Sequence, residues 1–178
     1  MKNRAVFRSV VCGLLIILLA PAKGIPGQQR SVVKIGVLVS LTGSWSSLGQ
    51  NTVTALQIAA DKIKTASRGQ DRFRLLVRDT QLDPSKALDA ITDLDRRGVK
   101  IIIGPQSSAE VAMIKPYADA HKILVISQGS TASSLAVAGD NIFRFCPSDM
   151  PEAEAMVALM RHDGIHAIVP LWRNDAGN

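Results

Sequence analysis

From residue 31 onward, short apolar runs alternate with longer amphipathic stretches, and turn residues separate them. Most of the short runs are β-branched or leucine-rich and almost continuously apolar, which is typical of strands covered on both faces. Strands that alternate with helices in this way indicate repeated βαβ units. The sequence therefore predicts an α/β fold with a doubly wound parallel sheet. Its strands are expected at residues 32–39, 73–78, 100–103, 123–127, 142–145 and 166–171.

The stretches between these strands carry apolar residues at helical spacing, so each is predicted to bury one face in the core. Their stripes are Val53, Leu56, Ala60 and Ile63; Ala87, Ala90, Ile91 and Leu94; Val111, Ile114 and Ala118; and Ala153, Met156, Val157 and Met160. Capping signals mark the helix starts. These signals are Ser47 with Gln50, Asp83 before Pro84, Ser107 with Glu110, and Asp149 with Glu152. Because the stripes are interpreted as core, no cofactor is expected.

The first 22 residues have the order of a secretory signal peptide. Three cations precede an apolar run at residues 10–20, and the small-x-small sequence of residues 20–22 follows it. The run is shorter than the roughly 20 residues that a membrane-spanning helix needs. The pattern predicts cleavage after Ala22, with residues 23–30 as a flexible leader. The mature protein is then expected to be periplasmic or otherwise extracytoplasmic.

The charge balance gives no sign of nucleic-acid binding. The full chain has 21 Lys and Arg against 15 Asp and Glu, a net charge of +6. Cleavage of the signal peptide would remove Lys2, Arg4 and Arg8 and leave a net charge of about +3. The remaining cations are interleaved with acids, as on a solvated helix face. Of the two cysteines, Cys12 lies in the predicted signal peptide, so after cleavage Cys146 is left without an intrachain disulfide partner.

A proline-bracketed polar segment at residues 147–151 marks the expected domain boundary. Before it, residues 31–147 are expected to form one α/β lobe. After it, residues 148–178 carry the pattern of only one helix and one strand, which cannot make a core of their own. Two interpretations stay open at this point: the final piece extends the first sheet, or it begins a second, truncated domain.

Motifs of the common enzyme classes are missing from the sequence. There is no G-x-S-x-G, H-E-x-x-H, C-x-x-C or G-x-x-x-x-G-K motif. An S-x-x-K match at residues 31–34 opens a strand and lacks its companion motifs. His121, His162 and His166 have no metal-ligand spacing with nearby acids. A non-enzymatic protein without a bound metal is therefore expected.

Polar residues and glycines gather in the loops that follow three of the predicted strands. These loops cover residues 41–49, 104–108 and 127–134. In a doubly wound sheet such loops open at the carboxyl edge, where ligands bind. Each loop leads into a helix start, whose unpaired N–H groups and partial positive charge favour an anion. With hydroxyls from Ser108 and Thr131, the pattern predicts a cradle for a carboxylate.

Three further residues of these loops, Ser107, Ser130 and Trp45, are candidates for the same site. Ser107 occupies the capping-box position, so its hydroxyl is predicted mainly to cap the helix. Ser108 is one residue further on, where its hydroxyl is expected to be free to face a ligand. Ser130 shares the loop of Thr131, and the sequence supports two roles for Trp45, as a packing residue or as part of the cleft wall.

Five short segments, in this order and spacing, resemble the leucine/isoleucine/valine-binding family of type I solute-binding proteins. They are residues 35–43 (IGVLVSLTG) with Gly49, Asp79, residues 83–87 (DPSKA), residues 104–108 (GPQSS) and residues 126–131 (ISQGST). The likeness covers the chain from about residue 32 to its end. The resemblance implies a two-lobed clamshell, with the chain crossing between lobes after the fifth strand. It also implies a role in amino acid transport, with an ABC permease in the membrane as partner.

The resemblance also implies roles for single residues. In amino-acid-binding members, the residues matching Ser108 and Thr131 hold the ligand carboxylate, and the carbonyl at the position of Gly129 accepts from its ammonium. Leu48 stands where such members often have an aromatic side chain that lines the side-chain pocket, which leaves the side-chain preference open. Members are roughly twice this length, in line with two domains of ordinary size. Arg173 and Asp175 fall where the cleft loops of the second lobe would begin, and neither is assigned a role.

The sequence is compatible to different degrees with a transport protein, a sensor domain and an enzyme. A transport-associated binding protein is favoured by the leader and by the loops at the carboxyl edge. The alternative is a ligand-sensing domain of the same fold in a receptor or regulator. A cytoplasmic sensor would lack the leader, and a membrane receptor would show a spanning helix in any continuation. An enzyme would need a nucleophile–base or metal constellation, which the sequence does not display.

Overall fold

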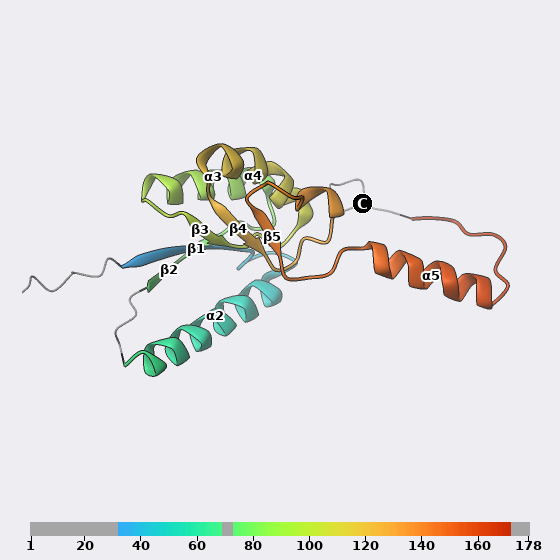
Figure 1. Cartoon of the computed structure of the whole chain (residues 1–178), viewed down its shortest axis with the longest axis horizontal. Helices are drawn as coiled ribbons and strands as arrows, with labels where there is room; N and C mark the ends of the chain where they lie inside the picture. The colour runs from blue at the N-terminus through green and yellow to red at the C-terminus, as the bar shows by residue number, and fades with distance from the viewer. Residues whose placement is uncertain (1–31, 69–72, 172–178) are drawn as a thin grey trace, which may run out of the picture. The chain divides into compact units, whose positions relative to one another are not determined.

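The computed structural model in Figure 1 describes residues 32–68 and 73–171. The predicted signal peptide and leader lie outside these residues. The elements are β1 (Val33–Val39), α2 (Ser46–Ala66), β2 (Phe73–Asp79), α3 (Pro84–Arg96), β3 (Ile101–Ile103), α4 (Ser108–His121), β4 (Leu124–Ser127), the 3₁₀ helix η1 (Ser133–Leu135), β5 (Ile142–Arg144) and α5 (Met150–His162). Five of the six predicted strands are present, and each lies within a residue or two of its expected bounds.

The five strands form one parallel sheet in the order β2-β1-β3-β4-β5. The order steps outward from β1 in both directions, so the sheet is doubly wound, and α2 lies on one face while α3 and α4 lie on the other (Figure 1). This confirms the predicted fold class. Because all strands run the same way, their carboxyl ends meet along one edge of the sheet.

The hydrophobic core lies between the sheet and the pair α3 and α4. Leu38, Ile102 and Val125 point into it from three strands, and all three are fully buried. The predicted stripes of α3 and α4 face them. These stripe residues are Ala87, Ala90, Ile91 and Leu94 on α3, and Val111, Ile114 and Ala118 on α4. Burial of each large aliphatic side chain contributes about 1.5–3 kcal/mol, so this layer supplies much of the stability of the lobe.

The opposite face of the sheet is only partly covered. Strand alternation and register place Val37, Ile103, Ile126 and Phe143 in one row on this face. Val37 is buried, Ile103 and Ile126 are half-buried, and Phe143 is 57% exposed. Five strands spaced about 4.8 Å apart span roughly 20 Å, whereas one helix is about 10 Å wide. Helix α2 alone cannot cover them.

The prediction that the α2 stripe is buried in the core was therefore wrong. Val53, Leu56 and Ala60 are only half-buried, and Ile63 is 47% exposed. Gly49 is the one residue of α2 that is buried. The spacing of the stripe predicted the helix correctly, but the degree of burial depends on neighbours that the described part of the chain does not supply.

Two of the four capping signals are confirmed. The Asp83 carboxylate accepts from the amides of Ser85 and Lys86, and Ser107 with Glu110 forms a complete capping box. Ser47 does not cap α2, because the N-cap lies two residues earlier, at Trp45, where no side-chain hydrogen bond is made. Asp149 stands at the N-cap of α5, but it also makes no side-chain cap.

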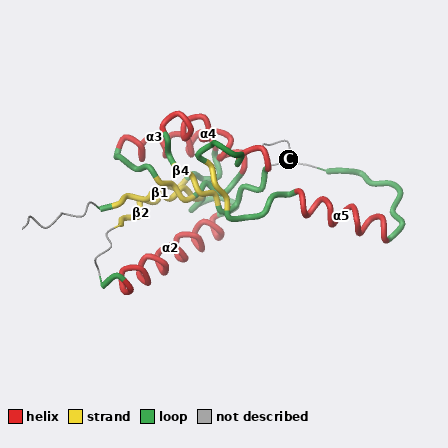
Figure 2. The backbone as a smooth tube through the Cα atoms, viewed as in Figure 1, coloured by secondary structure: helices red, strands yellow, loops and turns green. Residues whose placement is uncertain are grey.

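The predicted strand at residues 166–171 is absent. Residues 165–171 are irregular and exposed, and they follow α5, which has no buried residue (Figure 2). An isolated strand leaves its N–H and C=O groups without a ladder, so the apolar pattern by itself cannot form one. The stripe of Ala153, Met156 and Val157 is likewise uncovered. Among the described helices, none is long and apolar enough to cross a membrane.

Candidate ligand site

Three loops meet at the carboxyl edge of the sheet, after β1, β3 and β4. Side-chain hydrogen bonds tie them together. The Gln106 carboxamide oxygen accepts from the backbone N–H of Ser40 at 2.7 Å, which joins the loop after β3 to the loop after β1. The Ser127 hydroxyl donates to the carbonyl of Pro105 at 2.7 Å, which joins β4 to the loop after β3. The prediction that these loops form one edge is confirmed by the fold.

Two glycines allow this close packing. A Cβ atom at Gly129 would lie 2.4 Å from the carbonyl oxygen of Gln106, on the neighbouring loop. A Cβ atom at Gly49 would lie 1.9 Å from the carbonyl oxygen of Ser40, where the first turn of α2 crosses the end of β1. Any side chain at either position would push two loops apart.

Ser107 and Ser108 have different partners, although they are adjacent. The Ser107 hydroxyl accepts from the Glu110 amide and donates to the Glu110 carboxylate at 2.7 Å, so it belongs to the cap. The Ser108 hydroxyl lies 3.0 Å from the Ser130 hydroxyl, and both residues are buried. The sequence predicted a free hydroxyl at Ser108, but in the structure this hydroxyl is hydrogen-bonded to Ser130. Each hydroxyl can still accept or donate one further hydrogen bond.

The loop that carries Gly129 and Thr131 is hydrogen-bonded to Ser127, the last residue of β4. The Ser127 hydroxyl accepts from the Ser130 amide at 3.1 Å. The backbone N–H and the hydroxyl of Thr131 have no hydrogen-bond partner among residues 32–68 and 73–171. At the start of α4, the amides of Ser108 and Ala109 also have none in that part of the chain.

Unpaired donors thus come from two elements that the Ser108–Ser130 hydrogen bond joins. They are two amides at the positive end of the α4 dipole, together with the amide and the hydroxyl of Thr131. Such a set suits a carboxylate, which accepts several hydrogen bonds and is stabilised at a helix N-terminus. The Ala109 amide was missed in the sequence analysis, because backbone donors carry no residue-type signal.

The remaining predicted candidates lie at the start of α2. Trp45 is half-buried at the N-cap, and Leu48 is 49% exposed in the first turn. Arg173 and Asp175 lie outside the described residues.

Asp79, at the end of β2, forms hydrogen bonds to the loop after β1, a role that the sequence did not predict. Its carboxylate accepts from the Leu41 amide at 2.8 Å, the Thr42 hydroxyl at 2.8 Å and the Gln81 amide at 3.0 Å. Partial burial raises the pKa of Asp79, but these hydrogen bonds favour the charged form and together lower the pKa below its usual range. Asp79 thereby connects β2 to the same edge.

We predict that Asp79→Asn weakens the lobe at neutral pH, by about 1 kcal/mol or somewhat more. A carboxyl group whose pKa is depressed by folding stabilises the protein above its unfolded-state pKa of about 4, and this stabilisation is lost as the pH falls through the folded-state pKa. Urea unfolding at pH 7 and at pH 3 measures this. The difference between wild type and Asp79→Asn should shrink at pH 3. Asp61→Asn on the exposed face of α2 is the matched control, and an equal effect of both variants would contradict the prediction.

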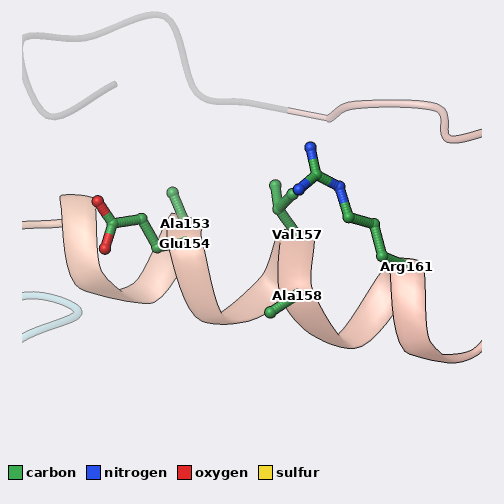
Figure 3. A pocket seen from close by; sticks show the side chains of 5 residues that line it. All are labelled: Ala153, Glu154, Val157, Ala158 and Arg161. Carbon is green, nitrogen blue, oxygen red and sulfur yellow. The ribbon is translucent and has the colours of Figure 1, made fainter.

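Other parts of the structure offer weaker candidates. A pocket on α5 is lined by Ala153, Glu154, Val157, Ala158 and Arg161, all from that one helix (Figure 3). None of the predicted site residues lines it, and it lacks polar groups converging from several elements. Within the described ranges, no group of three or more His, Cys, Asp or Glu side chains could hold a metal ion. The loops at the carboxyl edge remain the best candidate.

The sequence matches a known family across all of the described residues. A sequence profile for periplasmic binding proteins matches residues 32–177. The chain belongs to the periplasmic binding protein family. Its parallel sheet with flanking helices is the type I lobe of these proteins, as in the leucine-binding protein LivK of Thermotoga maritima. That structure is 28% identical, with a TM-score of 0.66, over 74% of this chain and 37% of the LivK chain.

Two curated proteins are also similar to this periplasmic binding protein. An uncharacterised protein of Methanocaldococcus jannaschii is 30% identical over 159 residues, which are 84% of this chain and 38% of that protein. Glutamate receptor 1.1 of Arabidopsis thaliana is 26% identical over 144 residues, which are 80% of this chain and 18% of the receptor. The chain thus spans less than two fifths of the length of each relative.

Proposed function

We propose that this chain is the first lobe of an extracytoplasmic solute-binding protein that serves an ABC importer. Its ligand is a small solute with a carboxylate, such as an amino acid. The observation that carries the proposal is the set of unpaired donors at the carboxyl edge, on Ser108, Ala109 and Thr131. The similarity to a leucine-binding protein supports an amino acid as the solute.

Within this proposal, each site residue has a role. The Ser108 hydroxyl and the Thr131 amide and hydroxyl bind the carboxylate, and the Gly129 carbonyl accepts from an ammonium group. Ser130 orients Ser108 through their 3.0 Å hydrogen bond. Trp45 and Leu48, on the first turn of α2, line the approach to the solute. Ser107 contributes through the helix cap alone.

The domain organisation is part of the same proposal. Residues 1–22 act as a signal peptide, residues 23–30 as a leader and residues 31–147 as the first lobe. Residues 148–178 are the crossing segment and the start of a second lobe. The chain covers 38% of the archaeal relative and 37% of LivK. This supports a second lobe, because the rest of each relative is long enough for another domain. The membrane partner is an ABC permease, and the chain performs no catalytic step.

A ligand-sensing role in a receptor is the second candidate. The similarity to a plant glutamate receptor favours it, since that match covers 80% of this chain. The two roles share the same solute site and differ in what the protein is attached to. A freely released periplasmic protein indicates transport, and a membrane-retained protein indicates sensing.

The proposal is tested by expressing the reading frame with its leader in a bacterium. We expect a shortened protein outside the cytoplasm with Lys23 at its N-terminus, which mass spectrometry of the N-terminal peptide will determine. A protein that contains both lobes is then screened against amino acids and against matched amines that lack the carboxylate. Stabilisation by amines and acids alike would contradict a carboxylate site, and an uncleaved cytosolic chain would contradict export.

A further inference from the structure

Three consecutive carbonyls of the loop after β4 bond to side chains from the segment that follows this loop. The Cys146 thiol donates to the carbonyl of Ser130 at 3.1 Å. One terminal nitrogen of Arg144, Nη1, donates to the carbonyls of Thr131 and Ala132, both at 2.9 Å. Residues 130–132 belong to no helix or strand, so these side chains supply the partners that a backbone ladder would otherwise supply.

The two contacts fix both peptide planes of Thr131. A trans peptide unit is planar, and its C=O and N–H point in opposite directions. The Ser130 carbonyl and the Thr131 N–H belong to one such unit, so holding the carbonyl at Cys146 directs the N–H of Thr131 to the other side of the loop. Arg144 holds the next unit through the Thr131 carbonyl. Together they determine where the unpaired N–H and the side chain of Thr131 point.

The backbone of Arg144 is fixed by its place in the sheet. Arg144 is the last residue of β5 and pairs with Ser127 of β4, and the Phe145 amide donates to the Ser127 carbonyl at 3.1 Å. Ile142, two residues earlier, is buried in the core. The guanidinium is half-buried and planar, and it offers donors in a fixed geometry, which suits it to holding adjacent carbonyls.

We propose that Arg144 and Cys146 are positioning residues for the solute site. They hold residues 130–132 in the shape that presents the N–H and hydroxyl of Thr131 to a carboxylate. This inference rests on the proposed function for its ligand, but the shape of the loop can be tested without one. The same two residues lie on the chain between β4 and α5.

The first test measures the reactivity of Cys146 in the full chain carrying Cys12→Ser, where it is the single thiol. In Arg144→Met, iodoacetamide should label Cys146 about tenfold faster than in the parent, the factor expected for the loss of one or two hydrogen bonds. Removal of a cation does not by itself make a thiol more reactive, so an acceleration reports a loosened loop. Arg97→Met, which removes an arginine bonded to Asp93 on α3, is the matched control and should leave the rate unchanged.

The second test separates positioning from a general loss of stability. The chemical shifts of the Thr131 and Ala132 backbone amides should change in Arg144→Met. In Arg144→Lys they should lie closer to the parent values, because an ammonium can still donate to these carbonyls. If Arg144→Met does not fold, the comparison of Arg144→Lys and Cys146→Ser with the parent decides the question by the same resonances. Unchanged labelling and unchanged resonances in the folded variants would overturn the positioning role.

The third test connects the loop to the solute, with L-leucine as the probe in a protein that contains both lobes. Arg144→Met should weaken leucine binding about tenfold, and Arg144→Lys should recover part of the loss. A loosened loop with unchanged leucine affinity would overturn the proposed link to the site. Failure of the proposed function has a different signature, since Thr131→Ala would then leave leucine binding unchanged while the labelling difference persists.

Discussion

Residues 23–178, purified as a monomer, should bind amino acids no more tightly than about 1 mM, which corresponds to roughly −4 kcal/mol. A clamshell shares its solute between two faces, and closure removes water from each polar contact, which strengthens those contacts. With one face, the donors of Ser108, Ala109 and Thr131 compete with bulk water for the carboxylate. Exposed hydrogen bonds of this kind contribute little net free energy.

Titration calorimetry with leucine, isoleucine and valine measures this affinity. The same titration with Thr131→Ala is the control for any weak signal, since binding at the proposed site should decrease further. Micromolar affinity in the single-lobe monomer would show that the two-lobed proposal is wrong.

The same isolated chain is expected to self-associate, because its apolar surface is uncovered on two elements. Phe143 is exposed and Ile103 and Ile126 are half-buried on the α2 face of the sheet, and Met156, Val157 and Leu159 are exposed on α5. Analytical ultracentrifugation measures the association, and Val157→Glu together with Leu159→Glu should reduce it. A strictly monomeric wild-type chain at about 100 µM, on the scale where exposed patches associate, would contradict this expectation.

In the complete two-lobed protein that we propose, Ser108→Ala and Thr131→Ala should each weaken binding of the solute by about 1.5–3 kcal/mol, or roughly ten- to a hundredfold. This is the usual range for a hydrogen bond to a charged group. Isothermal titration with the solute identified by the amino acid screen gives the affinities. The loss of affinity in Thr131→Ala should report the contact with the solute alone, because the Thr131 hydroxyl has no other partner in the described part of the chain.

Two neighbouring serines serve as controls for this prediction. Ser130→Ala removes the same hydrogen bond between loops as Ser108→Ala but keeps the Ser108 hydroxyl, so it should cost less affinity. Ser107→Ala should lower the free energy of unfolding by about 1 kcal/mol, as loss of an N-cap does, with little change in affinity. An affinity that depends on Ser107 and not on Ser108 would reverse the assignment of the two residues.

Local pattern determined much of the fold. The apolar runs predicted β1 to β5 within a residue or two, and the helical stripes of α3 and α4 predicted the buried layer around Leu94 and Ile114. Ser107 was predicted to cap α4 because a capping box involves residues only three positions apart. The position of the loops at one edge followed from parallel strands alone.

The tertiary structure decided what depends on distant partners. The Ser108–Ser130 pair joins residues 22 positions apart, and the Asp79–Leu41 hydrogen bond joins residues 38 positions apart. No local signal reports such contacts, because they exist only once the strand order brings β2, β1, β3 and β4 together. For the same reason Ile63 is exposed and residues 166–171 form no strand: periodicity specifies which face of an element is apolar, but whether that face is buried depends on the neighbours that cover it.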